Sequence, residues 1–256
     1  MDFLAIFIRG KGYDMNKQAA ASTEAQMIMI KASDGSGEFA AYLAQPASGA
    51  GPGLVIAQEI FGVNANLRQI ADHYAEAGYI VLVPDLFWRQ EPGVQLGYTP
   101  EDWQRAFQFF QGFDQDLGVD DLQATIDVLR ARPGCTGEVG VMGFCLGGKL
   151  AYLSACRTDA DVAIAYYGVG IEDALDEADD IECRLVVHIA GLDQYCPPEA
   201  QQKIIKGLAK HEDIEVHVYP NADHAFARPA GDHFHAESAQ LAEQRTLAVL
   251  HEAIGP

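Results

Sequence analysis

The segment with the clearest chemical potential is Gly143-Phe144-Cys145-Leu146-Gly147. A glycine two residues before a cysteine and another two residues after it form a Gly-x-nucleophile-x-Gly pattern, with a thiol in place of serine. In such a turn the nucleophile takes a strained backbone conformation, and the glycines remove side chains that would collide there. A helix that follows the turn places its positive N-terminus beside the sulfur, which favours the thiolate. A cysteine in a glycine-rich turn can also be buried and inert, so the neighbouring segments decide between the two interpretations.

The segments on either side of Cys145 favour the catalytic interpretation. Residues 138–142 form a short apolar run typical of a buried strand, and residues 146–156 have the pattern of a helix. A strand before the nucleophile and a helix after it are the context that this pattern requires. We therefore predict that Cys145 is a nucleophile exposed at the carboxyl end of a strand.

A thiol nucleophile needs a base, and the base needs an orienting acid. Asp193 comes shortly after a predicted strand at 184–190, and His224 follows another at 214–219. Because the carboxyl ends of parallel strands meet at one edge of a sheet, loops can bring both side chains beside Cys145. Two alternatives stay open: Asp223 could be the acid, and Asp193 could merely cap the next helix.

No metal and no cofactor are expected. His233 and His235 form a His-x-His pair, but no third ligand at a usual spacing joins them and His224. The sequence has no phosphate-binding loop and no dinucleotide fingerprint, since residues 143–148 lack the Gly-x-Gly-x-x-Gly spacing.

The loop at 58–62 follows an apolar predicted strand at 54–57 and is expected to complete an oxyanion hole. One backbone amide would come from Leu146, directly after the nucleophile, and the other from Ile60 in this loop. Glu59 stands beside Ile60, and a carboxylate that directly follows a buried strand is expected to point into the cleft.

Short apolar segments alternate with helical patterns along the rest of the chain. Strands are predicted at 27–32, 38–44, 54–57, 79–83, 138–142, 162–166, 184–190 and 214–219, and helices at 64–77, 101–113, 120–131, 146–156, 198–211 and 238–253. This alternation predicts an α/β fold, with a mostly parallel sheet of about eight strands covered by helices on both faces and an antiparallel pair at one edge. Residues 1–25 are interpreted as an N-terminal extension, and 26–256 as a single domain.

Composition narrows the choice of partners and compartment. The net charge of −20, from 17 basic and 37 acidic residues, argues against nucleic acid and anionic membranes as partners. It leaves anionic small molecules open, since one or two arginines can reverse the field inside a cleft. Five cysteines without a Cys-x-x-Cys motif favour a reducing cytoplasm, and no stretch approaches the ~20 apolar residues of a membrane span.

These residues resemble the dienelactone hydrolase (carboxymethylenebutenolidase) family of α/β-hydrolases over nearly the whole chain, from about residue 27 to 250. The matching blocks, in order, are 58–64, 84–86, 143–148, 166–170 and 224–228. The resemblance implies a triad of Cys145, His224 and Asp193 in a monomeric α/β-hydrolase. It also implies that Glu59 contacts the resting thiol until substrate displaces it. The family's reference reaction opens dienelactone, a cyclic enol ester with a free carboxylate, during the degradation of chlorinated aromatics.

The resemblance is weaker at the substrate contacts. Arg228 matches one of the arginines that hold the substrate carboxylate in the best-known members, but a second arginine and its companion tyrosine align with Trp103 and Phe107. The other predicted substrate contacts are Phe61, Arg89 and Tyr167. We therefore predict hydrolysis of an ester or lactone through a thioester acyl-enzyme, with a carboxylate-bearing substrate held by Arg228. A broader carboxylesterase or thioesterase and a non-catalytic binding protein on the same scaffold remain the alternatives.

Overall fold

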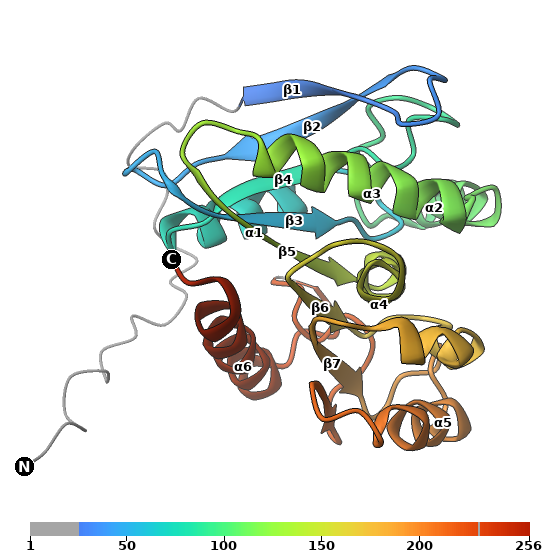
Figure 1. The fold of residues 1–256 in the computed structure, drawn as a ribbon. Coiled ribbons are helices and arrows are strands. Elements are labelled where there is room, and N and C mark those ends of the chain that lie inside the picture. The colour runs from blue at the N-terminus through green and yellow to red at the C-terminus, as the bar shows by residue number, and fades with distance from the viewer. Residues whose placement is uncertain (1–25, 230) are drawn as a thin grey trace, which may run out of the picture.

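A single sheet runs through the part of the chain that the computed structural model describes, residues 26–229 and 231–256 (Figure 1). Its strand order is β1-β2-β4-β3-β5-β6-β7-β8. The strands are β1 (Gln26–Lys31), β2 (Glu38–Ala44), β3 (Gly51–Ala57), β4 (Ile80–Pro84), β5 (Cys135–Phe144), β6 (Val162–Tyr166), β7 (Arg184–Ala190) and β8 (Ile214–Tyr219). β2 pairs antiparallel with β1 and β4, and the remaining pairs are parallel. The predicted sheet and its antiparallel edge are confirmed, whereas the predicted extension at 1–25 lies outside the described residues.

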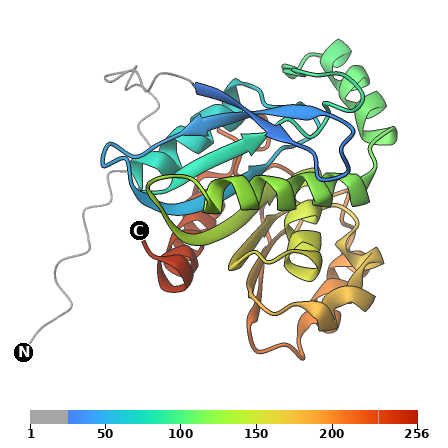
Figure 2. The same ribbon diagram turned by 45° about the horizontal axis from the view of Figure 1, so that its top comes forward.

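Helices cover both faces of the sheet (Figures 1 and 2). They are α1 (Ala65–Glu76), α2 (Pro100–Gln111), α3 (Gln115–Arg130), α4 (Leu146–Arg157), α5 (Pro198–Leu208) and α6 (Ala236–Ile254). α1 and α6 pack on one face, and α3, α4 and α5 pack on the other. Two short 3-10 helices that the sequence did not predict, Ile171–Asp173 and Leu175–Asp180, lie between β6 and β7. In the described part of the chain, no helix is long and apolar enough to cross a membrane.

Strand β3 illustrates why the central strands are apolar throughout. Leu54 and Ile56 contribute to the core under α1 and α6, whereas Val55 and Ala57 contribute to the core under α3 and α4. Successive side chains of a strand point to opposite faces, and both faces are covered here, so none of the four is exposed. Each fully buried branched side chain contributes about 1.5–3 kcal/mol to stability.

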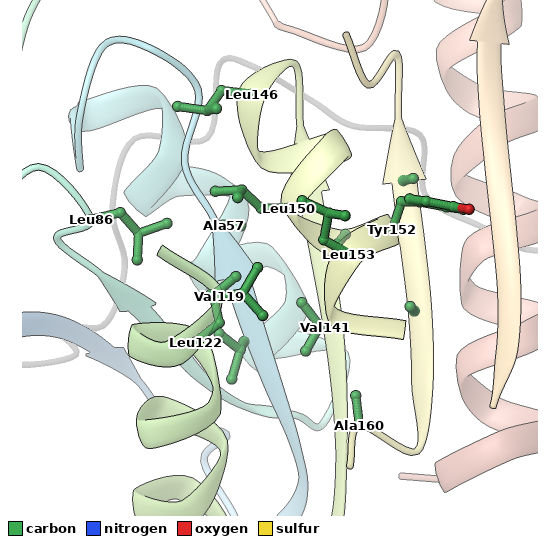
Figure 3. Packing of buried hydrophobic residues seen from close by; sticks show 14 of the residues in the cluster. Ala57, Leu86, Val119, Leu122, Val141, Leu146, Leu150, Tyr152, Leu153 and Ala160 are labelled. Carbon is green, nitrogen blue, oxygen red and sulfur yellow. The ribbon is translucent and has the colours of Figure 1, made fainter. Parts of the chain in front are cut away.

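The core beneath the nucleophile is continuous. Figure 3 shows Val119 and Leu122 of α3 and Leu150 of α4 directed toward Val141 of β5 and Ala57 of β3, and all five residues belong to one buried cluster. This packing holds the strand that precedes Cys145 and the helix that follows it as one rigid unit.

Several element boundaries differ from the prediction, and two of them have a clear local cause. Helix α3 begins at Gln115 and not near residue 120, because the Asp114 carboxylate accepts hydrogen bonds from the free amides of Asp116 and Leu117. Strand β3 begins at Gly51 and not at residue 54. A Cβ atom at Gly51 would lie 2.0 Å from the carbonyl oxygen of Gly78, so this glycine serves a close backbone approach within the strand, not a turn.

Candidate active site

Cys145 occupies a strained turn between β5 and α4. Its φ is 57° and its ψ is −114°, a conformation that non-glycine residues seldom adopt. Its amide donates to the carbonyl of Tyr166 at 3.0 Å. A Cβ atom at Gly143 would lie 1.9 Å from the carbonyl oxygen of Gly147, and one at Gly147 would lie 2.2 Å from that of Ala57. Both glycines are therefore sterically required, as the pattern predicted.

His224 and Asp193 meet beside this turn, in the loops after β8 and β7. The imidazole Nδ1 lies 2.7 Å from Asp193 Oδ2, and the imidazole also hydrogen-bonds the Cys145 side chain. The second carboxylate oxygen of Asp193 accepts from the amide of Tyr195 at 2.8 Å. Asp223, the alternative acid, instead accepts from the amide of His224 at 2.7 Å. Asp223 thus stabilises the backbone turn at His224, whereas Asp193 orients the imidazole ring.

The charge of the imidazole follows from these contacts. His224 and Asp193 are buried, with 5% and 3% of their surfaces exposed. Burial alone lowers the pKa of His224, but the electrostatic interaction with Cys145 and the hydrogen bonds of the ring with Asp193 and Cys145 outweigh it and raise that pKa to about 10. At neutral pH the site therefore holds an imidazolium between a carboxylate and a sulfur.

Two backbone amides near Cys145 are free. Among the hydrogen bonds of residues 26–229 and 231–256, neither the Ile60 amide nor the Leu146 amide has an acceptor. Leu146 is the first residue of α4, where an amide has no partner within its own helix. Buried donors are rarely left unpaired without a role. Both amides are thus available to a negatively charged oxygen next to the thiol.

Glu59 pairs with Arg228. Arg228 Nε donates to Oε2 of Glu59 at 3.0 Å, and Nη2 donates to Oε1 at 2.8 Å. Both side chains are buried. The resemblance led us to expect Glu59 on the resting thiol, but its described hydrogen bonds go to the guanidinium, because a two-pronged bond uses both carboxylate oxygens.

A cavity opens above the sulfur and is mostly apolar. Its lining residues are Ile60, Phe61, Trp103, Phe107, Phe110, Cys145, Val169, Tyr195, His224 and Arg228. The structure therefore brings the predicted nucleophile, base, cation and three of the predicted aromatic contacts to one space.

Residues 39–254 of the sequence match the family described as "Dienelactone hydrolase family". The chain belongs to the dienelactone hydrolase family. A carboxymethylenebutenolidase of Pseudomonas putida is 39% identical over 226 residues, which cover 87% of this chain and 94% of the relative. One from Cupriavidus pinatubonensis is 37% identical over 215 residues, covering 84% of this chain and 92% of the relative.

Solved structures agree with this assignment. A Klebsiella pneumoniae protein provisionally named a dienelactone hydrolase superimposes with a TM-score of 0.78 at 26% identity, covering 89% of this chain and 98% of that one. The α/β-hydrolase fold expected from the sequence is confirmed. Membership of the family places the chain among hydrolases of ester and lactone bonds.

Two predicted substrate contacts do not line the cavity of this family member. Arg89 is held elsewhere, with Nη2 2.9 Å from the buried Asp121 of α3 and Nη1 2.8 Å from Asp34 in the turn between β1 and β2, so its charge ties its own loop to both. Tyr167 is buried with its ring centroid 5.2 Å from that of His224. Tyr167 packs edge-on against the base, and the contact of Arg89 and Tyr167 with substrate has no support from the lining of the cavity.

Three lining residues were not predicted: Phe110, Val169 and Tyr195. Phe110 could have been found, because it follows Phe107 by three residues on the same face of one helix. Tyr195 follows Asp193 by two residues, and its ring meets the His224 ring edge-on at 4.9 Å. Val169 lies within the matching block at 166–170, but that block did not indicate that its side chain lines the cavity.

Proposed function

We propose that this protein hydrolyses a lactone or enol ester with a Cys145–His224–Asp193 triad, through a thioester acyl-enzyme. The observation that best supports the proposal is the setting of Cys145. Its sulfur stands at a strained strand-to-helix turn, in hydrogen-bond contact with an imidazole that Asp193 holds. A thiol, a base and an orienting acid in this order form the arrangement for nucleophilic acyl transfer.

In the first half-reaction, the thiolate sulfur of Cys145 attacks the carbonyl carbon of the ester. The carbonyl oxygen becomes an oxyanion, and the amides of Ile60 and Leu146 donate to it, each worth about 3 kcal/mol of barrier. The C–O bond to the leaving oxygen then breaks, and the imidazolium of His224 gives that oxygen its proton. Because an enolate is a good leaving group, this step needs little proton donation from His224.

In the second half-reaction, the neutral imidazole of His224 removes a proton from water, and the resulting hydroxide attacks the thioester carbonyl. The C–S bond breaks, the product leaves as a carboxylic acid, and the thiolate–imidazolium pair is restored. Asp193 keeps the ring oriented through both halves and stabilises its positive charge. The Glu59–Arg228 pair lies beside this path, and in the proposed cycle it positions substrate.

One alternative has an observation in its favour. Trp103 and Phe107 line the cavity where charged side chains would suit a carboxylate, which is compatible with a broader carboxylesterase or thioesterase. A non-catalytic binding protein has no such support, since it would not need an assembled triad. We further propose that the protein acts as a cytoplasmic monomer on small molecules, with no nucleic acid, membrane or cofactor involved.

The acyl-enzyme provides the test. The protein is mixed with a dienelactone-type enol lactone, the reaction is quenched with acid within one turnover, and the peptide that contains Cys145 is weighed by mass spectrometry. The proposal is supported if the wild-type peptide gains the mass of the acyl group, and if Cys145→Ala shows neither this mass increase nor turnover. Undiminished turnover by Cys145→Ala refutes it. Faster hydrolysis of simple aryl esters or thioesters than of the lactone favours the alternative.

A further inference from the structure

One wall of the cavity is an aromatic face of helix α2. Trp103, Phe107 and Phe110 are spaced by four and three residues, so they share one side of the helix, and all three line the cavity. Their rings form a row, with centroids 6.3 Å apart from Trp103 to Phe107 and 6.3 Å apart from Phe107 to Phe110. Phe61 extends the row, since its ring meets Trp103 edge-on at 4.9 Å. An aromatic ring of a ligand would find both stacking and edge-on partners here.

A neighbouring side of α2 anchors this wall to the core. Ala106 and Phe109 are buried in the core, and the Phe109 ring stacks on Phe87 at 5.2 Å. The helix begins at a capping box in which Thr99 and Asp102 satisfy each other's amides. The aromatic wall is thus a preformed part of the site and not a loosely attached flap.

The charges in the cavity are balanced. Among the described residues that line it, Arg228 is the only lysine or arginine, and Glu59 occupies the Nε–Nη2 edge of its guanidinium. The guanidinium also lies over two aromatic rings, with its central carbon 4.7 Å from the ring centre of Tyr98 and 5.2 Å from that of Phe61. The imidazolium of His224 is balanced in the same way by Asp193.

A substrate carboxylate would therefore lose its hydration in a mostly apolar space without meeting an uncompensated cation. The net charge of −20 on the whole chain adds a repulsive field to this local cost. A neutral ring faces neither penalty and gains contact with the wall.

We propose that this site selects neutral esters or lactones that carry an aromatic ring, with Trp103 and Phe107 as specificity-determining residues. The inference rests on the proposed hydrolysis at Cys145 and narrows its substrate class. It also replaces the expectation, drawn from the resemblance, of a substrate held by its carboxylate.

Three six-membered lactones test the selectivity: 3,4-dihydrocoumarin, its 6-carboxylate, and δ-valerolactone, which lacks the fused ring. Each kcat/KM is divided by the rate of hydroxide-catalysed opening of the same lactone, which removes intrinsic reactivity. We expect dihydrocoumarin to exceed both others by at least about tenfold. Equal or faster normalised hydrolysis of the 6-carboxylate overturns the proposal.

Variants then assign the preference to the wall. Trp103→Leu and Phe107→Leu should each lower the preference for dihydrocoumarin over δ-valerolactone by roughly 3- to 10-fold. Phe234→Leu is the matched control, because Phe234 is 42% exposed, close to the 40% of Phe107, but does not line the cavity. An unchanged preference in both wall variants would also overturn the proposal.

Binding separates this inference from the proposed function. If the wild-type protein opens none of the three lactones, the proposed function fails. The selectivity is then decided by equilibrium dialysis of each lactone with Cys145→Ala, which needs no turnover. Tighter binding of dihydrocoumarin than of the 6-carboxylate supports the inference, and the reverse order refutes it.

Discussion

Glu59 and Arg228 are 169 positions apart in the chain, yet they form a buried two-pronged ion pair within the active site, at 3.0 Å and 2.8 Å. Glu59 belongs to the loop after β3, and Arg228 belongs to the loop that carries His224. The pair therefore ties the free Ile60 amide and the catalytic base into one frame. Only 5% of the surface of Glu59 and 9% of that of Arg228 are exposed. The loss of either partner therefore leaves the other charge buried without compensation.

Single removal of either partner should be strongly destabilising. We expect Glu59→Gln and Arg228→Gln each to lower the free energy of unfolding by about 3–5 kcal/mol, and the double variant to lose much less than the sum. Urea unfolding at neutral pH measures all three. The exposed Arg105–Glu91 pair is the control, whose removal should cost at most about 1 kcal/mol. Similar losses from the buried and exposed pairs would show that burial does not determine the cost.

The same arginine tests substrate charge. If Glu59 already satisfies Arg228, the double variant Glu59→Gln with Arg228→Gln, which leaves no unpaired charge, should reduce kcat/KM for dihydrocoumarin and for its 6-carboxylate by the same factor. This comparison is made on folded protein at a temperature well below the variant's unfolding midpoint. A loss confined to the carboxylated lactone, seen as a higher KM, would mean that Arg228 binds substrate carboxylate.

Replacement of the nucleophile should separate chemistry from folding. We expect Cys145→Ala to lose hydrolysis while keeping the wild-type fold, and Cys145→Ser to keep at most a small residual rate, because a hydroxyl needs a stronger base than a thiol. Cys156→Ala is a matched control, since burial raises the pKa of Cys156 to about 12 and leaves that thiol unreactive. Steady-state rates measure hydrolysis, and circular dichroism measures whether the fold is kept. A Cys156→Ala variant as inactive as Cys145→Ala would point to a structural cause.

The acid and the base should act as one unit. Asp193→Ala and His224→Ala are each expected to lower kcat by orders of magnitude, and the double variant should lose little more than the worse single variant. Asp223→Ala is the control, because Asp223 contacts only the backbone amide of His224 among the catalytic groups. Additive losses, or a larger loss from Asp223→Ala than from Asp193→Ala, would contradict the assignment.

The parts of the site that the sequence predicted depend on short-range constraints. The turn at Cys145 is specified by Gly143 and Gly147, whose roles are steric and local. Asp193 and His224 could be chosen as the candidate acid and base because each follows a strand, and parallel strands end at a common edge of the sheet. The mostly parallel character of the sheet also followed from the alternation of strands and helices, so the carboxyl edge could be located before any contact was known.

Long-range pairing of charges could not be predicted in the same way. Arg89 and Arg228 are both arginines in loops near the site, but Asp121 binds the first and Glu59 binds the second. With 37 acidic residues in the chain, the sequence offers many partners for each cation and no rule to choose among them. The orientation of the Tyr167 side chain could not be predicted either, because it depends on an unusual positive backbone φ of 39° at that residue.

The protonation of His224 predicts how stability depends on pH. The pKa of His224 is raised from 6.5 to about 10 in the folded protein, so the folded state binds this proton more tightly than the unfolded state does. The stabilisation is therefore complete below about pH 6.5, declines as the pH rises, and is lost above about pH 10. We expect the difference in unfolding free energy between the wild type and His224→Gln to shrink across that range, as measured by urea unfolding at several pH values.

A second variant identifies the source of the shift. The electrostatic interaction with Cys145 is the largest contribution that raises the pKa of His224, ahead of the hydrogen bond that Asp193 accepts from the ring. Cys145→Ala should therefore move the imidazole pKa back toward 6.5, with Asp193 retaining part of the increase, and an NMR titration of the His224 ring protons would detect the change. Unchanged titration of this ring in Cys145→Ala would show that the sulfur carries no charge in the resting enzyme, and the thiolate–imidazolium pair would have to be abandoned as the starting state of the reaction.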